Sequence, residues 1–335
     1  MTAPALRIDD LHVRFPDFVR TVQAVRGVSL TVQPGEVFGL VGESGSGKSI
    51  TALSCLGLVP PPGQVTGSVA VTGREVVGRG DRELADMRGG TAAMIFQNPA
   101  TAMNPFLSIG RQMSDVIRAH RALDPKQARE AAEAAIAAVH IPDPALALKK
   151  YPHQLSGGQL QRVMIAMAMA CEPRLLIADE PTTALDVTIQ AQILGLLREL
   201  ADDTGLAILF ITHDLGVVAA LCDRVAVMYG GLIVESGAVA RVFAAPAHPY
   251  TLKLLETVPE VGQGKDELVY IAGQVPDMAV PPDGCTFHPR CDKATDICVR
   301  RRPESRAAHD GGGVACHHAI GIPTLDLVAE QGGAR

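Results

Sequence analysis

The sequence lacks any apolar run long enough to cross a membrane. Its apolar stretch Ala-Ile-Leu-Phe-Ile at 207–211 has only the length of a buried strand. The first residues, MTAPALRIDD, lack the charged-then-apolar order of a secretory signal, so we expect the chain to remain in the cytoplasm. An excess of basic residues is also missing. The formal net charge of −6 argues against broad nonspecific binding to nucleic acid.

The sequence also lacks the cysteine pattern of a disulfide framework. The seven cysteines are an odd number, and four of them crowd into residues 285–316, which favours metal chemistry over disulfides in the cytoplasm. Hydrophobic residues make up 47% of the chain and charged residues 20%, which is typical of a compact folded protein. A length of 335 residues predicts more than one domain or subdomain.

The stretch VFGLVGESGSGKSITAL, residues 37–53, predicts a nucleotide-binding loop. An apolar strand at 37–41 is followed by the pattern G-x-x-x-x-G-K-S and then by helix-forming residues. Glycines let successive N–H groups converge on one concavity, where the start of a helix favours a phosphate. Lys48 would reach the β- and γ-phosphates, and the Ser49 hydroxyl would ligate Mg²⁺. The residues expected to contact ATP here are Gly42, Ser44, Gly45, Ser46, Gly47, Lys48, Ser49 and Ile50.

Strands are predicted before this loop, at 6–15 and 25–32, with a turn-rich hairpin between them. Phe15, on the first strand, is a candidate to stack on adenine, although a plain core position explains it equally well. Residues 56–75 contain a proline-rich run and short β-like pieces, so we expect a connecting region. A strand at 91–96 then ends in Gln97-Asn98-Pro99.

Residues 98 to about 155 predict a helical insertion. Asp124-Pro125-Lys126-Gln127 supplies an N-cap, a first-turn proline and a capping-box glutamine for one of its helices. The next helix begins after LSGGQ, with Ser156 as the natural N-cap. Its first turn, Gly157-Gly158-Gln159, is either an exposed anion site or an ordinary glycine-containing helix entry.

Two further apolar strands end in polar residues that carry chemistry. Leu175 to Ala178 leads into Asp179 and Glu180, where Asp179 can hold Mg²⁺ and Glu180 can orient or deprotonate an attacking water. The strand at 206–212 leads into His213. A histidine at a strand end is usually a solvated or capping residue, but here it falls where the γ-phosphate would lie, which favours a catalytic role.

The cysteine-rich tail predicts a metal centre whose nature stays open. Cys285, Cys291, Cys298 and Cys316 are separated by 5, 6 and 17 residues, wider than the tight pairs of common zinc sites. Four thiolates suit a [4Fe–4S] cluster, zinc is the alternative, and unmetallated thiols are the third reading. Nearby histidines that could ligate instead are His288, His317 and His318. Four arginines either offset the charge of a cluster or are simply solvated: Arg290, Arg300, Arg301 and Arg302. The remaining cysteines, at 55, 171 and 222, are expected to be small buried hydrophobes.

Taken together in order, the motifs GESGSGKS, FQNP, LSGGQLQR, LLIADEP, ALD and ITHD resemble the ATP-binding subunits of ABC transporters. The resemblance covers residues 6 to about 257, and LSGGQ is especially specific to that family. The pieces SGKSITALSCLGL, YPHQLSGGQLQR, HPYT and GCTFHPRC look like the oligopeptide/dipeptide importer branch, and SITALS resembles the first of its two paired ATPases.

This resemblance implies an α/β phosphate-loop (RecA-like) ABC ATPase core with an antiparallel β subdomain, a helical subdomain and a small Cys-rich extension. The boundaries it implies are 1–97 and 166–257 for the two parts of the core, 98–165 for the helical subdomain with the signature motif, and 258–335 for the extension. It also implies a head-to-tail dimer with ATP at the interface, closed by ATP and reopened by hydrolysis.

The resemblance assigns roles to single residues. One nucleotide is served by Lys48, Ser49, Gln97, Asp179, Glu180 and His213, with Mg²⁺ held by Ser49, Gln97 and Asp179. The partner's nucleotide is contacted by Ser156, Gly157, Gly158 and Gln159, with Asp186 of the ALD motif also at the nucleotide. The four tail cysteines are the implied ligands of a [4Fe–4S] cluster.

The implied partners are two integral-membrane permease subunits, a second and paralogous ATPase subunit, and an extracytoplasmic solute-binding protein. The chain itself would lie at the cytoplasmic face of the cell membrane and bind no nucleic acid. The competing readings are a soluble ABC ATPase acting on DNA or ribosomes, an exporter half, and an importer of other cargo such as nickel complexes.

Overall fold

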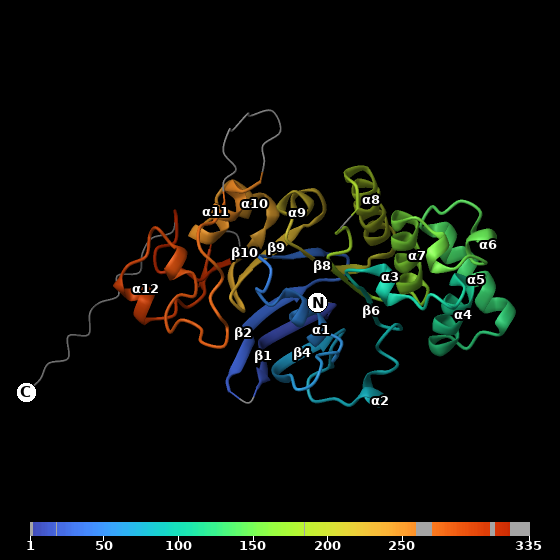
Figure 1. Cartoon of the computed structure of the whole chain (residues 1–335), viewed down its shortest axis with the longest axis horizontal. Helices are drawn as coiled ribbons and strands as arrows, with labels where there is room; N and C mark the ends of the chain where they lie inside the picture. The colour runs from blue at the N-terminus through green and yellow to red at the C-terminus, as the bar shows by residue number, and fades with distance from the viewer. Residues whose placement is uncertain (1–2, 18, 184, 259–269, 309–311, 322–335) are drawn as a thin grey trace, which may run out of the picture.

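The computed structural model describes residues 3–17, 19–183, 185–258, 270–308 and 312–321. Figure 1 shows an elongated molecule with strands at its centre, helices α4 to α6 at one end and the cysteine-bearing segment around α12 at the other. No helix among these residues is both long and apolar enough to span a membrane.

An eight-stranded sheet forms the centre of the molecule. Its strand order is β11-β12-β10-β9-β3-β8-β7-β6, with parallel pairing from β9 through β3, β8 and β7 to β6. The bounds are β3 Val37–Val41, β6 Ala92–Ile95, β7 Leu175–Asp179, β8 Ala207–Thr212, β9 Arg224–Tyr229, β10 Leu232–Ala238, β11 Arg306–Ala307 and β12 Gly313–Val314. Strands β3, β7 and β8 are buried at every position, as expected of parallel strands covered on both faces.

A second, antiparallel sheet has the order β2-β1-β4-β5. Its strands are β1 Leu6–Pro16, β2 Thr21–Val32, β4 Gln64–Val71 and β5 Arg74–Glu75. The two strands predicted before the loop are therefore present. The short β-like pieces expected within the connecting region 56–75 are present as β4 and β5, but β4 is longer than expected and pairs along most of β1. Its glycine and small polar residues hid a strand that only the neighbouring β1 makes stable.

The helices between β6 and β7 form the predicted insertion. Short α2 Asp81–Leu84 precedes it, and it comprises α3 Pro99–Ala102, α4 Ile109–His120, α5 Pro125–Ala138, α6 Pro144–Ala147, the 3₁₀ turn η1 Pro152–Gln154 and α7 Gly157–Met169. Asp124 caps α5 together with Gln127, and Ser156 caps α7, both as predicted. Buried Met113, Ala132 and Val163, one from each of three helices, belong to the same hydrophobic cluster as core strand β3.

The remaining helices follow the core strands. They are α1 Lys48–Ser54, α8 Val187–Thr204, α9 Leu215–Leu221, α10 Val239–Ala244, α11 Pro249–Glu256, η2 His288–Arg290 and α12 Asp296–Arg300. Helix α8 ends at Gly205, whose φ of 68° gives the left-handed C-cap that glycine favours.

The cysteine-bearing segment is tied to the central sheet. Strand β12 pairs antiparallel with β10, with Glu235 opposite Val314, so the cysteine-bearing segment lengthens the sheet that carries the phosphate loop. Of the predicted extension 258–335, residues 259–269, 309–311 and 322–335 lie outside the described residues. The boundaries at 97, 165 and 257 stay predictions.

Candidate nucleotide-binding site

The phosphate loop, Gly42 to Ser49, joins the buried end of β3 to the first turn of α1. Gly42 has φ of 153°, and a Cβ on it would lie 2.1 Å from Met228 O. Gly47 has φ of 104°, and a Cβ on it would lie 2.4 Å from Ala24 O. Only glycine fits these two positions, because neither the backbone angle nor the space admits a side chain. The loop is thus held against β2 and β9 while its N–H groups stay together.

The side chain of Lys48 folds back toward the first residues of the phosphate loop. Its ammonium group donates to Gly42 O at 2.7 Å and to Glu43 O at 3.0 Å, and 5% of the residue is exposed. Burial lowers the pKa of Lys48, whereas the nearby carboxylates of Glu180 and Asp179 act in the opposite direction. A buried ammonium whose partners are mainly carbonyl oxygens is well suited to receive a phosphate anion.

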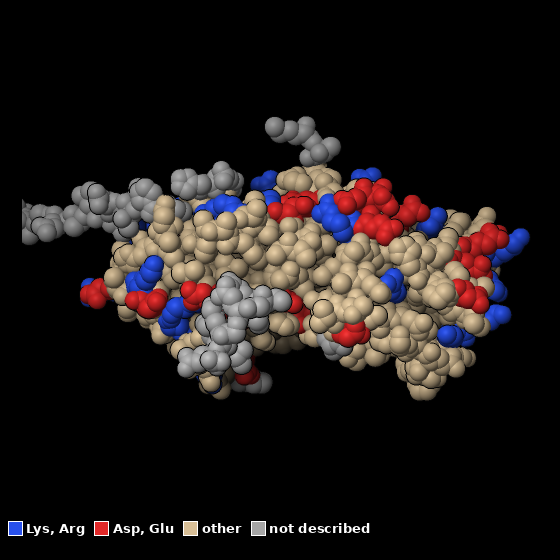
Figure 2. Space-filling model, turned by 90° about the horizontal axis from the view of Figure 1, so that it is seen from above, with Lys and Arg blue, Asp and Glu red and all other residues tan. Residues whose placement is uncertain are grey.

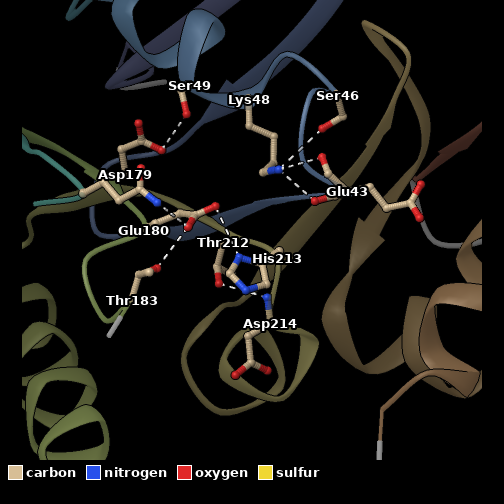
Figure 3. A network of polar contacts seen from close by, with 12 residues as sticks. Glu43, Ser46, Lys48, Ser49, Asp179, Glu180, Thr183, Thr212, His213 and Asp214 are labelled. Atoms are coloured by element: carbon tan, nitrogen blue, oxygen red, sulfur yellow. Dashed lines mark hydrogen bonds and ion pairs between the residues drawn. The ribbon is translucent and has the colours of Figure 1, made fainter. Parts of the chain in front are cut away.

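Asp179, the last residue of β7, faces Ser49 across the loop (Figure 3). The Ser49 hydroxyl donates to Asp179 Oδ1 at 3.1 Å, and burial raises the pKa of Asp179. A hydroxyl and a carboxylate brought together from two elements are the oxygen donors that Mg²⁺ prefers, so the residues present fit that ion.

Glu180 is the centre of the polar network in Figure 3. Its Oε2 accepts hydrogen bonds from Gln97 Nε2 and from the Thr183 hydroxyl, both at 3.0 Å, and its Oε1 lies 3.3 Å from His213 Nδ1. The Glu180 backbone has φ of 48°, a conformation that costs a non-glycine residue about 1–3 kcal/mol. Three strand ends, after β6, β7 and β8, therefore converge on one carboxylate. The sequence had singled out Gln97, Glu180 and His213 but missed Thr183.

The signature segment, Ser156 to Gln159, does not join this network. Ser156 Oγ accepts from Gln159 N, and within the described residues no hydrogen bond links the segment to the phosphate loop. A Cβ on Gly158 would lie 2.7 Å from Ile189 of α8, so the helix start packs closely on that helix. Asp186 caps α8 by accepting from Ile189 N at 2.9 Å, and Ala184 lies outside the described residues.

The other predicted nucleotide contacts differ in their exposure. Phe15 is half-buried on β1 and packs against a hydrophobic cluster formed largely by β1, β2 and β4, so its role beside adenine stays a prediction. Ser44 and Gly45 are exposed, and a Cβ on Gly45 would meet no atom within 4 Å. Ser46 is buried with its hydroxyl 3.5 Å from Lys48 Nζ, and Ile50 is half-buried in α1.

All four tail cysteines line one cavity. Cys285, Cys291, Cys298 and Cys316 share its wall with His248, Phe287, His288, His317 and His318, and every cysteine is a free thiol. Burial raises the pKa of Cys285 to about 11 and that of Cys316 to about 12, and the other thiols of the group act in the same direction. Four thiols on the wall of one cavity are placed to face one common ligand.

His248 leaves an unused donor at this cavity. It is 1% exposed, and its Nδ1 accepts from Tyr250 N at 3.0 Å, so its proton lies on Nε2. This Nε2 has no hydrogen-bond partner in the described part of the chain, and burial lowers the pKa of His248 to about 3. A sulfide or thiolate in the cavity would supply the missing hydrogen-bond acceptor. The lining of the cavity therefore fits a sulfur-rich group. Among the described residues, no three His, Cys, Asp or Glu side chains are placed to hold a single metal ion.

Two expectations about the remaining side chains need correction. Cys55 and Cys222 are buried as expected, but Cys171 is only partly buried, at the end of α7 near Arg121. Arg290 is neither solvated nor turned toward the cysteines. Its side chain is 4% exposed and pairs with Glu43 of the phosphate loop at 2.6 Å. That pair joins residues 247 positions apart, a distance at which no sequence pattern indicates contact.

Comparison with known proteins agrees with this geometry. Residues 25–183 match the ABC transporter family model, and residues 234–298 match the model of the oligopeptide/dipeptide transporter C-terminal region. The chain is 47% identical to the dipeptide transport ATP-binding protein DppD of Bacillus subtilis (strain 168), over 93% of each protein. It is 46% identical to the oligopeptide transport ATP-binding protein OppD of Salmonella typhimurium, over 89% of each.

Solved structures confirm the expected fold. A dimeric ATP-binding cassette in a post-hydrolysis state, bound to ADP and Pi, matches with a TM-score of 0.62 and 26% identity, over 70% of this chain and 98% of the cassette. The match covers a phosphate-loop ATPase core of the kind predicted from the motifs. The chain therefore belongs to the ATP-binding subunits of ABC transporters, in the group that carries the oligopeptide/dipeptide transporter C-terminal region.

Proposed function

We propose that this ABC ATPase energises the import of short peptides through membrane partners. The observation that carries the chemistry is the convergence of Gln97, Glu180 and His213 beside the phosphate loop. The cargo class is supported by relatives that align with about nine-tenths of this chain. These relatives are named as ATP-binding proteins of dipeptide and oligopeptide transport.

In this mechanism Glu180 is the general base. Its two oxygens are held by Gln97, Thr183 and His213, so the carboxylate has one orientation in which to take a proton from water. His213 braces the γ-phosphate and the water, and Lys48 binds the β- and γ-phosphates after releasing its loop carbonyls. Ser49, Asp179 and Gln97 would hold Mg²⁺, which neutralises charge on the phosphates.

The signature segment serves a second nucleotide. Ser156, Gly157 and Gly158 present a helix start that is not bonded to the chain's own loop, as a half-site for ATP on a partner requires. ATP would then close a head-to-tail pair of ATPases, and hydrolysis would reopen it. The inferred partner ATPase is a paralogue. The pair would dock on two permease subunits at the cytoplasmic face of the membrane, and a solute-binding protein would deliver the cargo.

We further propose a [4Fe–4S] cluster as the group bound by the four cysteines, with zinc as the alternative. Its support is the cavity that the four cysteines share and the unused Nε2–H of His248. The cluster would be held by the thiolates of Cys285, Cys291, Cys298 and Cys316. The cluster would supply a structural cross-link among the segments that carry these cysteines.

Action on nucleic acid is the less supported function. Figure 2 shows acidic and basic side chains interspersed over the visible face, without a broad basic area. Recognition of a phosphate backbone depends on such an area, because its affinity comes mainly from Lys and Arg contacts.

One experiment tests the coupling and the cargo together. The full chain is purified with its membrane partners in liposomes, and ATP hydrolysis is measured with a solute-binding protein loaded from a peptide library. Stimulation by particular peptides is the expected result. ATPase activity that ignores every loaded peptide, or that responds to nickel complexes instead, overturns the peptide assignment.

A separate measurement addresses the cysteines. Iron, acid-labile sulfide and zinc are quantified in anaerobically purified protein, together with its visible absorbance. Iron and sulfide in about equal amounts, with visible absorbance, are expected for the cluster. Stoichiometric zinc without iron, or no metal, contradicts it.

A further inference from the structure

Arg290 is the buried cation that the ATPase chemistry does not use. It stands immediately before Cys291, and only 4% of its side chain is exposed. Its Nε donates to Ala272 O at 2.9 Å, and Nη2 donates to Ile271 O at 2.9 Å. Nη1 contacts Tyr229 Oη at 3.3 Å, and the two terminal nitrogens reach Glu43 at 2.6 and 3.1 Å. Five contacts match the five N–H donors of a guanidinium, so the side chain is fixed in one position.

Glu43, whose carboxylate accepts hydrogen bonds from both terminal nitrogens of Arg290, belongs to the phosphate loop. Its carboxylate binds Arg290, its N–H donates to Tyr250 Oη at 3.0 Å, and its carbonyl accepts from Lys48 at 3.0 Å. In Figure 3 the Glu43 carboxylate points away from Lys48 while its carbonyl faces it. One loop residue therefore joins the phosphate-binding lysine to Tyr250 of α11 and to the cysteine-bearing segment.

The contact at Glu43 adds an anchor to a loop that already packs against β2 and β9. Gly42, Gly45 and Gly47 give it three residues with positive φ and wide backbone freedom, and ordering that freedom opposes ligand binding. The bidentate contact is of the strong, geometrically specific type, because both partners are charged and planar. Holding Glu43 in place keeps the first half of the loop ready for the phosphates before ATP arrives.

We propose that Arg290 is a positioning residue for ATP binding, which acts through Glu43 and makes the cysteine-bearing segment part of the nucleotide site. The inference rests on the proposed ATPase chemistry and makes no assumption about what the four cysteines bind. It assigns Arg290 to substrate affinity, while the hydrolysis step stays with Glu180.

The test compares four full-length variants: Arg290→Gln, Arg290→Lys, Glu43→Gln and the double variant Glu43→Gln/Arg290→Gln. Arg300→Gln is the matched control, because Arg300 lies in the same segment but is exposed and pairs with Asp296. ATP affinity is titrated with a fluorescent ATP analogue, and KM and kcat are measured on the complex with its membrane partners. Circular dichroism and thermal melting establish that each variant folds.

The expected result is a weakening of ATP affinity by about 10-fold in Arg290→Gln and Glu43→Gln, the scale of one charge-assisted hydrogen bond. KM rises accordingly, and kcat at saturating ATP stays within about two-fold, because loop ordering precedes chemistry. The double variant loses no more ATP affinity than either single variant. Arg290→Lys keeps the positive charge but not the bidentate contact with Glu43, so its ATP affinity lies between those of Arg290→Gln and the unaltered chain. Arg300→Gln binds ATP as the unaltered chain does.

Unchanged ATP affinity in folded Arg290→Gln and Glu43→Gln overturns the proposal, as does a fall in kcat at constant KM. If Arg290→Gln does not fold, Glu43→Gln and Arg290→Lys decide the question. Failure of the proposed transport function gives a different pattern, in which the unaltered complex ignores loaded peptides while the binding titrations remain readable.

Discussion

Glu180, the proposed general base, is a strained residue at the centre of a polar network. Its φ of 48° places the carboxylate where three strand ends meet, and Gln97, Thr183 and His213 hold it there. Strain of this kind persists at functional sites because the surrounding contacts determine the conformation.

Replacing Glu180 by Gln should leave ATP binding intact and lower turnover roughly 10²–10⁴-fold, because the base is lost while the shape is kept. Steady-state ATPase and nucleotide titration check this. Glu172→Gln is the control, since Glu172 also has positive φ, of 55°, but sits beyond α7 beside Arg121. Near-normal ATPase in Glu180→Gln would remove Glu180 from the base role.

The phosphate-loop glycines offer a second test at this scale. Gly47→Ala places a Cβ 2.4 Å from Ala24 O, whereas Gly45→Ala places one in open space, and both start from positive φ. Gly45→Ala should cost only the backbone strain, about 1–3 kcal/mol of folding free energy. Gly47→Ala should cost more and abolish ATP binding, as measured by thermal melting and nucleotide titration. Equal losses in the two variants would show that the contact with β2 is unimportant.

Among the elements, α7 is the one whose start has a proposed task beyond the fold. Ser156 and Ser108 are both serine N-caps in the helical insertion, the first of α7 and the second of α4. Each Ser→Ala change should cost about 0.5–2 kcal/mol of folding free energy, because a cap is lost. Only Ser156→Ala should also lower ATPase activity in the assembled complex, with ATP binding to the isolated chain unchanged. Equal ATPase in the two variants would argue against the second half-site.

Elements with local signals could be predicted from the sequence. The caps at Asp124 and Ser156 and the strand before the phosphate loop each rest on a few neighbouring residues. Strand β12 could not be predicted, because two residues carry no periodicity and its stability comes from pairing with β10.

The candidate site divides in the same way. Its motif residues are recognisable from their order along the chain, and the structure brings Lys48, Asp179, Glu180 and His213 to one edge of the sheet. Thr183, His248 and the Arg290–Glu43 pair were missed, since their meaning depends on burial and on partners distant in sequence. Spacing alone gave no signal for them.

At the scale of the whole molecule, Phe287 joins the cysteine-bearing segment to the ATPase core. It is 1% exposed and lies 5.2 Å from Tyr229 and 5.3 Å from Tyr250, ring centre to ring centre. Such aromatic clusters bury large apolar areas, so core and segment should unfold as one cooperative unit.

Phe287→Ala should lower the thermal midpoint of the full chain by about 4–7 °C, in one transition, because about 3–5 kcal/mol is lost with a buried phenyl ring. Calorimetry measures both the midpoint and the number of transitions. Val299→Ala, in the same segment but 50% exposed, should change little. A separate, early transition with the main one unshifted would make the segment an independent unit.

The position of β3 in the central sheet has a consequence for folding during synthesis. Its two neighbours, β8 and β9, are made about 170 to 190 residues after it, so the strand that carries the phosphate loop waits unpaired while most of the chain is translated. Such long-range parallel pairing is slow and leaves apolar strand edges exposed to aggregation. Nascent chains shorter than about 230 residues should therefore depend on chaperones, and ATP binding should appear only once β9 has left the ribosome.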